Sequence, residues 1–427
     1  MRNFLWGVAT SAFQIEGNIE NDFTDWENLG KFKNDNADPR YENGSNHWDL
    51  WETDFEYLKE LNLNAYRFSI EWARIEPTRN EYSQPAIDRY HQMIDKLIEM
   101  NIEPIITLHH FTHPSWFHSL SPWTDASSIE IFTKFAKKMI KEFAPKIKFW
   151  ITFNEPLVWA LAAYGDAKFP PGQKDLYKVM DVTYNILYAH IRIYDMLKNF
   201  DEDIKVGIAK HFVIFKEARS WFLDKSLANR LHQFFNVMIL DAFRTNTLEI
   251  YFPFLLDYVS YLPLDNKIDF WGINYYYRLH AKFKINYKNP MELFAKNPTT
   301  DMGWEIYPNG LKKIIKLVSK YDKEMIITEN GIATDDEKLR IKFIKKHLKV
   351  VSKQIKRGKL LIGFFYWSLL DNYEWLEGKS KRFGLIHVDY ENKFKRTFKP
   401  AAFIFADLIK KFKTNNNSKG KIKSKAI

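Results

Sequence analysis

The chain has 427 residues, of which 46% are apolar and 27% charged, a composition typical of a globular protein and unlike that of a disordered one. It contains no cysteine, which excludes disulfides, thiolate zinc sites, iron–sulfur clusters and cysteine nucleophiles. Its formal net charge of +10 raises the question of an anionic partner, such as nucleic acid or a membrane surface.

The N-terminal residues carry no recognisable targeting segment. The apolar run of residues 4–9 is shorter than the core of about 7–15 residues that a signal peptide needs, and polar residues follow it directly. No later stretch reaches about 18 uncharged apolar residues, so we expect no transmembrane segment. We therefore expect a cytoplasmic protein, and nothing in the sequence indicates an oligomeric state.

Short apolar stretches alternate with segments whose apolar residues recur at three- and four-residue steps, as in amphipathic helices. The expected strands cover residues 5–10, 65–70, 103–108, 149–153, 205–211, 268–274, 324–328 and 361–367. The expected helices cover residues 49–61, 85–100, 129–143, 176–200, 225–243, 309–320, 335–357 and about 400–412. Eight such units predict an α/β fold in which parallel strands close as a single (β/α)8 TIM barrel.

The last residues differ from the rest in composition. From residue 410 to residue 427 there are seven lysines and no acidic residue. Without these lysines the chain has 56 basic residues against 53 acidic ones, so residues 1–409 carry only about +3. We expect a (β/α)8 catalytic domain over residues 1–409 and a Lys-rich, disordered tail over residues 410–427. Contact of the tail with anionic lipid or RNA stays an alternative, but nucleic acid is not expected as the main partner.

Two glutamates stand out because active sites of this fold lie at the C-terminal ends of the strands. Glu155 follows Asn154 after the fourth strand, and Glu329 precedes Asn330 after the seventh. Alone, either is more often a loop or capping residue. Paired carboxylates suit cleavage of a glycosidic bond, in which one acid protonates the leaving oxygen and the other attacks carbon or activates water.

The residues near the two glutamates suggest separate roles. A nucleophile must stay ionised, and Arg67 and the Tyr276 hydroxyl could lower the pKa of Glu329. A general acid must stay protonated, which calls for apolar surroundings of Glu155. We expect those surroundings to come from three residues near it in sequence: Phe153, Pro156 and Trp159.

Four histidines lie close together in the sequence, at positions 109, 110, 113 and 118, and raise the possibility of a metal site. His109 and His113 have the four-residue spacing of ligands on a helix. They follow a strand and precede Pro114, where a helix is not expected, and no glutamate completes an HExxH pattern. We expect no metal site.

From residue 4 to residue 403 the sequence resembles glycoside hydrolase family 1, the retaining β-glucosidases and β-glycosidases. The resemblance rests on blocks that occur in the order of the family: FLWGVATSAFQIEG (4–17), NAYRFSIEWARIEP (64–77), TLHHFTHP (107–114), TFNEP (152–156), DFWGINYY (269–276), GWEIYP (303–308), ITENG (327–331), and FYWSLLDNYEW with RFGL (365–375, 382–385). Any one pentapeptide would be weak evidence, whereas several blocks in register are specific.

The resemblance implies a retaining exo-β-glycosidase that works by double displacement, with Glu155 as acid/base and Glu329 as nucleophile. The two carboxyl groups would then lie about 5–5.5 Å apart. Arg67, Asn274 and Tyr276 are grouped with them as catalytic residues. The substrate-binding residues that it implies are Gln14, His110, Asn154, Trp304, Trp367, Glu374 and Trp375. Among these, Asn154 would hold the sugar 2-hydroxyl and Trp304 would form a platform for the leaving group. No metal or cofactor is needed, and the partner is a small-molecule β-glycoside.

The preferred sugar is less well defined than the reaction. Phe111 stands where many family members have Trp, and Lys379 stands in place of a Tyr. We expect hydrolysis of β-D-glucosides, with β-galactosides and β-fucosides as further candidates. Glu374 would repel a phosphate, so 6-phosphoglycosides are not expected. Two alternatives stay open: transfer of the sugar to an alcohol or a second sugar, and a pseudoenzyme that binds sugar without cleaving it.

Overall fold

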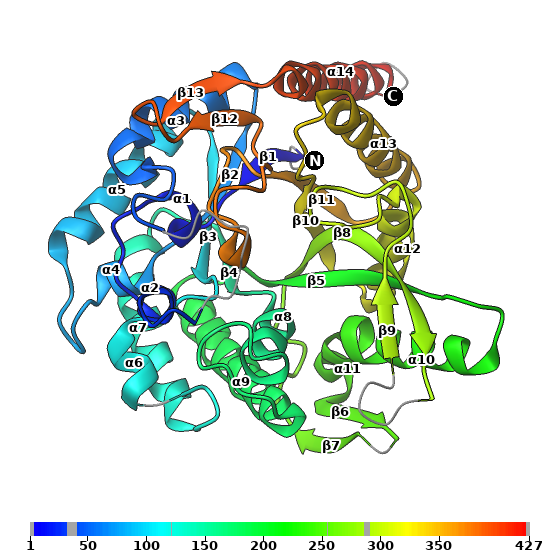
Figure 1. The fold of residues 1–427 in the computed structure, drawn as a ribbon. Coiled ribbons are helices and arrows are strands. Elements are labelled where there is room, and N and C mark those ends of the chain that lie inside the picture. The colour runs from blue at the N-terminus through cyan, green and yellow to red at the C-terminus, as the bar shows by residue number, and fades with distance from the viewer. Residues whose placement is uncertain (1–3, 32–40, 121, 254, 286–290, 424–427) are drawn as a thin grey trace.

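The computed structural model describes residues 4–31, 41–120, 122–253, 255–285 and 291–423 (Figure 1). Within these residues, eight parallel strands form a closed barrel, because each pairs with its neighbours and the last pairs again with the first. The barrel strands are β1 (Leu5–Ala9), β2 (Ala65–Ser69), β3 (Glu103–His109), β4 (Phe149–Asn154), β5 (Lys205–Glu217), β8 (Phe270–Phe283), β10 (Glu324–Gly331) and β11 (Leu361–Trp367). Each overlaps a predicted strand, and the predicted (β/α)8 TIM barrel is confirmed.

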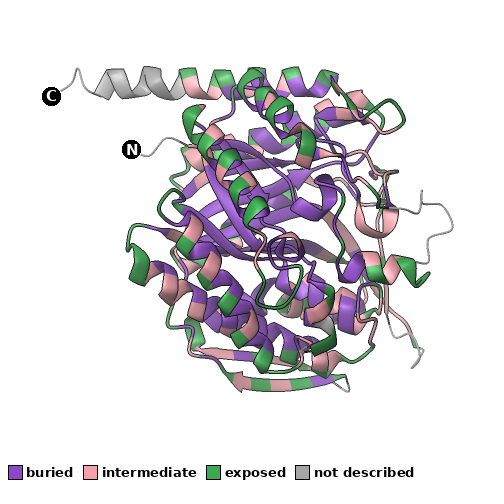
Figure 2. Cartoon of the chain, turned by 90° about the vertical axis from the view of Figure 1, so that its left-hand side faces the viewer, coloured by how far each residue is buried: buried purple, intermediate pink, exposed green. Residues whose placement is uncertain are grey.

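The barrel strands are buried on both faces, which explains why they read as continuous apolar runs. Every residue of β1, β2 and β4 is buried, and Figure 2 shows the strands as a buried centre surrounded by helices with exposed outer faces. Gly331 at the end of β10 lies against Trp367 of β11. A Cβ atom there would lie 1.8 Å from the Trp367 carbonyl oxygen, so only glycine lets these two strand ends approach each other.

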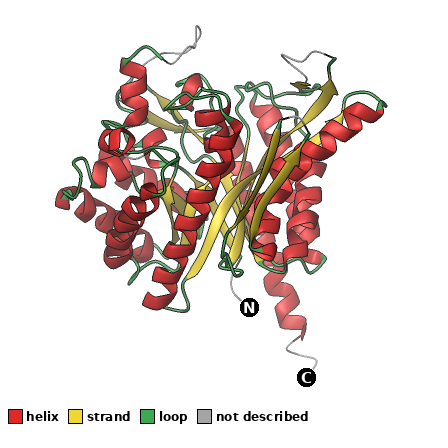
Figure 3. Cartoon of the chain, turned by 90° about the horizontal axis from the view of Figure 1, so that it is seen from below, coloured by secondary structure: helices red, strands yellow, loops and turns green. Residues whose placement is uncertain are grey.

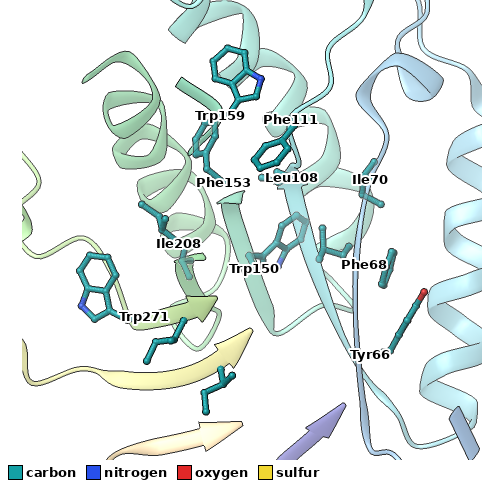
Figure 4. Close-up of a cluster of buried hydrophobic side chains, with 14 of the residues drawn as sticks. Tyr66, Phe68, Ile70, Leu108, Phe111, Trp150, Phe153, Trp159, Ile208 and Trp271 are labelled. Carbon is teal, nitrogen blue, oxygen red and sulfur yellow. The ribbon is translucent and has the colours of Figure 1, made fainter. Parts of the chain in front are cut away.

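Helices follow the strands and cover the outside of the barrel (Figure 3). Those that match predicted helices are α3 (His47–Glu60), α5 (Gln84–Glu99), α7 (Ser127–Phe143), α9 (Leu176–Phe200), α12 (Pro308–Val318), α13 (Glu337–Lys356) and α14 (Pro400–Lys423). Side chains of the strands and helices interdigitate in a large core. Figure 4 shows part of it, with Trp150 of β4 and Trp271 of β8 among the buried side chains.

The helix predicted over residues 225–243 is interrupted in the structure. It consists of α10 (Phe222–His232), a π-helical turn η2 (Gln233–Val237) and α11 (Met238–Thr245). Asn236, buried in this turn, donates to the Val213 carbonyl at 2.7 Å and accepts from the Val213 amide at 3.0 Å. This side chain ties the turn to β5, a long-range contact that helical periodicity does not report.

Several shorter elements in the loops were not predicted. They include the hairpin of β6 (Thr247–Phe252) and β7 (Leu256–Tyr261), the strand β9 (Met291–Phe294), and the hairpin of β12 (Ile386–Asp389) and β13 (Lys395–Phe398). Short helices occur as well: α1 (Ala12–Ile15), α2 (Asp22–Asn28), α4 (Trp72–Ile75), α6 (Ser115–Leu120) and α8 (Pro156–Ala160). They are too short to show a clear periodicity.

The last helix, α14, continues past residue 410, where we expected the folded domain to end. Its buried residues up to Ile409 pack on the barrel, and the ring of Phe412 lies 5.1 Å from that of Trp6. Side chains beyond Thr414 and all of residues 424–427 lie outside the described part, so the expected disordered tail stays a prediction. Among the described helices, none combines the length and the apolar character needed to span a membrane.

Candidate active site

The strand ends of the barrel open into a cavity of about 690 Å³. Ten of the twelve site residues expected from the sequence line it: Gln14, His110, Asn154, Glu155, Tyr276, Trp304, Glu329, Trp367, Glu374 and Trp375. The other two, Arg67 and Asn274, are fully buried and hydrogen-bonded to the lining residues. The structure therefore brings all twelve to the same end of the barrel, although they come from distant parts of the chain.

Glu329 lies near the end of β10 with two strong hydrogen-bond donors. Arg67 Nη1 donates to Oε1 at 2.6 Å, and the Tyr276 hydroxyl donates to Oε2 at 2.7 Å. Burial raises the pKa of Glu329 to about 7, while Arg67 and the Tyr276 hydroxyl act in the opposite direction. Both oxygens of this carboxyl group are thus held in fixed positions by donors that favour its charged form.

Glu155 lies directly after β4, at the start of α8, with a left-handed backbone conformation (φ 45°) that is uncommon for a residue other than glycine. Its Oε1 atom accepts from Asn274 Nδ2 at 2.8 Å and lies 2.9 Å from His211 Nδ1. Burial acts to raise the pKa of Glu155, but a charged His211 and the Asn274 amide outweigh it and hold the pKa below its ordinary value.

The two glutamates belong to one hydrogen-bond chain. Arg67, which contacts Glu329, also donates through Nη2 to Asn154 Oδ1 at 2.7 Å. The same oxygen accepts from Asn274 Nδ2 at 3.1 Å, and Asn274 in turn contacts Glu155. Asn274 lies opposite Glu329 in the pairing of β8 with β10. The geometry of each carboxyl group is therefore coupled to that of the other through groups that are themselves buried.

Polar groups also line the cavity on the side of β1 and β11. Gln14 Nε2 donates to Glu374 Oε2 at 3.1 Å, and Asn372 donates to the same oxygen at 2.8 Å. Burial raises the pKa of Glu374 to about 8, and the negative charges of Glu329 and Glu155 add to this effect. We call this part of the cavity the polar end, defined by Gln14, His110, Asn154, Trp367 and Glu374.

Aromatic rings border the polar end. The ring of His110 lies 6.0 Å from that of Trp367 and 6.2 Å from that of Trp375, and both pairs of ring planes are nearly parallel. Trp304 packs against Tyr277 at 4.8 Å and Tyr276 at 5.4 Å. Indole faces suit the apolar C–H face of a sugar ring, and carboxylates and amides suit its hydroxyls.

The expected apolar surroundings of Glu155 are wrong for the three residues named. Phe153 of β4 and Trp159 of α8, both labelled in Figure 4, do not line the cavity, and their rings pack against that of His109 at 5.3 and 5.8 Å. Successive residues of a strand point to opposite faces, so Phe153 points outward where Asn154 points inward. Pro156 does not line the cavity either and forms the first turn of α8. The immediate partners of the Glu155 carboxyl group are polar.

Two functional neighbours were missed by the sequence analysis. His211 contacts Glu155, and Lys210 is buried beside it, donating to the carbonyls of His211 at 3.1 Å and of Phe235. Burial lowers the pKa of Lys210 to about 7. A signal existed, because residue 211 ends the fifth predicted strand, and the rule that strand ends carry the site applies there too.

The neighbouring histidines form a structural cluster. His113 Nε2 lies 2.8 Å from His109 Nε2 and accepts from Trp123 Nε1 at 2.8 Å, while its Nδ1 lies 2.9 Å from Asp22 Oδ2. Within the described residues, no group of three or more potential ligands is arranged to hold a metal ion. These contacts explain the burial of both rings without a ligand role.

Comparison with known proteins gives a consistent result over nearly the whole chain. The family described as "Glycosyl hydrolase family 1" matches residues 1–414. A "1,4-beta-D-glucan glucohydrolase" of Thermotoga neapolitana is 34% identical, with 95% of this chain and 97% of that protein covered.

Solved structures agree with the sequence comparison. A beta-glycosidase from Pyrococcus horikoshii is 36% identical and superimposes with a TM-score of 0.88, covering 96% of this chain and 94% of that one. A family 1 b-glucosidase from Thermotoga maritima, in complex with isofagomine lactam, is 31% identical with a TM-score of 0.86, covering 96% and 98%.

Proposed function

The chain belongs to glycosyl hydrolase family 1 and is a β-glycosidase, and from this premise we propose that it hydrolyses β-D-glucosides with retention of configuration. Glu329 is the nucleophile and Glu155 the acid/base. The observation that carries this proposal is the difference in partners: a permanently charged guanidinium and a hydroxyl hold Glu329, whereas Glu155 meets an amide and an imidazole.

The distribution of charge between the two carboxyl groups follows from these partners. Two buried carboxylates repel each other, so one proton is favoured on the pair. Arg67 stays charged at every relevant pH and, with Tyr276, favours the negative charge on Glu329. In the structure the order of the two pKa values is the reverse, because a charged His211 holds the pKa of Glu155 below its ordinary value and burial raises the pKa of Glu329 to about 7. The proposed mechanism needs the proton on Glu155, so a bound substrate has to reverse this order by excluding water from Glu155 while Arg67 keeps favouring the charge on Glu329.

In the first step, a carboxylate oxygen of Glu329 forms a bond with the anomeric carbon. The bond from that carbon to the leaving oxygen breaks, its electron pair stays on the oxygen, and the proton of Glu155 moves there. The aglycone departs as an alcohol and leaves a glucosyl ester on Glu329. Arg67 and Tyr276 hold the attacking carboxyl group in position, which reduces the entropic cost of reaching the transition state.

In the second step, Glu155, now a carboxylate, takes a proton from water. The water oxygen bonds to the anomeric carbon, and the ester bond to Glu329 breaks. Two inversions give net retention, and both carboxyl groups return to their first protonation states. The chemistry uses side chains of this chain and water.

The polar end supports a terminal sugar residue as the group that is transferred. Gln14 and Glu374 can each meet two adjacent hydroxyls, and Asn154 lies beside the catalytic pair where a 2-hydroxyl would bind. Ring stacking by Trp367 adds apolar contact. Glucosides are favoured because the relatives named above include a glucan glucohydrolase and a glucosidase.

The test uses two matched variants and an aryl β-glucoside. Glu329→Gly should abolish hydrolysis, and added azide should restore turnover and give the α-glucosyl azide. Glu155→Gly should instead give the β-glucosyl azide, because azide then attacks the intact covalent intermediate. Glu324→Gln, at the other end of β10, serves as control with activity close to that of the wild type.

Anomeric configuration gives an independent check. Proton NMR of early product should show the β-anomer first. Release of the α-anomer would overturn the retaining mechanism, and a wild-type protein inactive on gluco-, galacto- and fucosides would favour the pseudoenzyme. Activity of Glu329→Gly close to that of the wild type, without azide, would overturn the assignment of the nucleophile.

A further inference from the structure

The helix α13 carries an unusual concentration of positive charge. Eight of its 20 residues are basic and one is acidic, Glu337, which accepts a hydrogen bond from the buried Arg340. Without this helix, the 56 basic and 53 acidic residues of the first 409 positions become 48 and 52. The positive charge of the folded part is therefore concentrated on α13 and not spread over the surface.

Every exposed residue of α13 is a lysine. At 3.6 residues per turn these lysines fall within an arc of about 100°, and at 1.5 Å per residue their row is about 27 Å long. Apolar residues on the other side of the helix, such as Phe343 and Leu348, are buried in the core. We call the exposed row the lysine face, defined by Lys338, Lys342, Lys345, Lys346, Lys349, Lys353 and Lys356.

The lysine face has no carboxylate partners among the described residues. None of its seven lysines forms an ion pair there, whereas Lys138 and Lys146, elsewhere on the surface, meet Glu142 and Asp95 at 2.7 and 2.6 Å. Neighbours at three- and four-residue steps along the lysine face carry the same charge, and such pairs destabilise a helix. A partner with negative charge would offset this repulsion.

The helices on either side of α13 extend the basic surface. α13 packs against α12 and α14, and the three helices follow one another around the outside of the barrel (Figure 1). Three of the four exposed residues of α12 are lysines, at positions 312, 313 and 316. α14 exposes Lys410 and Lys411 after a single aspartate, Asp407. The lysine face is thus the centre of a broad basic surface.

A lipid surface fits the lysine face better than a nucleic acid does. Recognition of bases and of single phosphate groups relies on the bidentate guanidinium of arginine and on amide or aromatic side chains, none of which is exposed on α13. An anionic bilayer attracts every basic residue that lies within a Debye length of it, without a need for fixed positions. Flexible lysine side chains suit such a diffuse charge.

We propose that the lysine face docks the protein on bilayers that contain anionic phospholipids. α13 connects the end of β10 with the start of β11, so it runs along the side of the barrel and not across the cavity. A bilayer held at this side leaves the cavity open to solvent. The proposal is independent of the chemistry that is assigned to Glu155 and Glu329.

Co-sedimentation of the full-length protein with vesicles tests the proposal. Vesicles of phosphatidylcholine mixed with phosphatidylglycerol should bind the protein at low salt and release it at high salt, and vesicles of phosphatidylcholine alone should not bind it. Each lysine near the surface should change the partition coefficient by about fivefold, the equivalent of about 1 kcal/mol. The quadruple variant Lys342→Gln, Lys345→Gln, Lys349→Gln, Lys353→Gln should therefore bind at least about 100-fold more weakly.

The matched control removes the same number of charges from α7, which lies across the barrel from α13 (Figure 1). The variant Lys134→Gln, Lys137→Gln, Lys138→Gln, Lys141→Gln should bind anionic vesicles nearly as well as the wild type. Thermal melts check that both variants fold, so the test remains valid whether or not the protein hydrolyses glucosides.

Several outcomes would overturn the proposal. Absence of binding, equal binding to both kinds of vesicle, or an equal loss in the two variants would show that the lysine face does not recognise anionic lipid. Release from anionic vesicles by double-stranded RNA at the same phosphate concentration would identify nucleic acid as the preferred partner. A change of oligomeric state in the α13 variant, with vesicle binding unchanged, would identify a second copy of the chain.

Discussion

The cavity has two unlike parts: the polar end around Gln14 and Glu374, and an apolar end lined by Phe215, Phe252 and Leu279. At the polar end, Gln14 donates to Glu374 and Asn154 accepts from Arg67, and the three of these residues that line the cavity lie at the ends of barrel strands or in the segments directly after them. At the apolar end, Phe215, Leu279 and Phe252 come from strand extensions and a hairpin outside the barrel.

The difference assigns separate tasks to the two ends. Hydrogen-bonding groups in fixed positions can distinguish one arrangement of sugar hydroxyls from another, because a buried polar group without a hydrogen-bond partner reduces the favourable free energy of binding. Apolar contact is less specific and grows with the area that is covered. We therefore expect the polar end to select the sugar and the apolar end to influence the choice of leaving group. Substitutions at each end should affect different substrate properties.

The largest effect is expected at the polar end, from Glu374→Ala. Two hydrogen bonds between the carboxyl group and sugar hydroxyls, at about 1.5 kcal/mol each, are worth about 3 kcal/mol, which corresponds to about a 100-fold loss of kcat/KM. The loss should be the same for butyl and octyl glucosides, because the carboxyl group does not face the aglycone. Glu391→Ala, at an exposed turn, is the control.

If the loss of kcat/KM in Glu374→Ala depended on the length of the alkyl chain of the glucoside, the two ends of the cavity would not act independently. It would mean that the position of the sugar depends on what fills the apolar end. The measurement is kcat/KM for both glucosides with the variant and with the wild type, under the same conditions.

The two ends also differ in how far the sequence revealed them. The resemblance of the motifs around Glu155, Glu329 and Glu374 to family 1 implied the residues of the polar end. Phe215 and Leu279 gave no such signal, since 46% of the chain is apolar and most of it packs in the core. Only the pairing of β5 with β8 beyond the barrel shows that these two face a cavity.

Sequence patterns report burial and periodicity but not contacts between distant residues, which explains the errors about Glu155 and His211. The eight strands were found because burial on both faces gives continuous apolar runs. The prediction of apolar residues around the Glu155 carboxyl group was wrong because closeness in sequence was taken for contact in space. Phe153 points to the other face of β4. His211 was passed over although it ends a predicted strand, because a lone histidine has no motif to mark it.

A smaller effect, on pH dependence, is expected at the boundary between the ends, from His211→Asn. A charged His211 lowers the pKa of Glu155, so its removal should raise that pKa. Glu155 must be protonated to act as the acid, and it would keep its proton to higher pH. The alkaline limb of kcat/KM should therefore move to higher pH, with a change of less than about tenfold at the optimum.

Measurement of kcat/KM for an aryl glucoside between pH 4 and pH 10 checks this prediction. His91→Asn, which removes a histidine paired with Glu142 on the outer helices, is the control and should leave the limb in place. An unchanged alkaline limb in His211→Asn would mean that His211 does not tune the acid, and its contact with Glu155 would then be structural.

The smallest effect is expected from removal of residues 415–427, because the described part of α14 that leads into them is attached at the end of the barrel opposite the cavity. α14 is held by contacts that precede this segment: Phe412 packs on Trp6 of β1, and Lys413 donates to the Asn62 carbonyl just before β2. Both contacts lie where the strands begin, opposite the catalytic end, and Figure 3 shows α14 at the same end of the barrel as the N-terminus.

Truncation after Thr414 should leave kcat/KM and Tm unchanged while removing four of the seven C-terminal lysines. A fall in kcat/KM would connect the charge of these lysines to catalysis across the length of the barrel, whereas an unchanged value would show that catalysis does not need them.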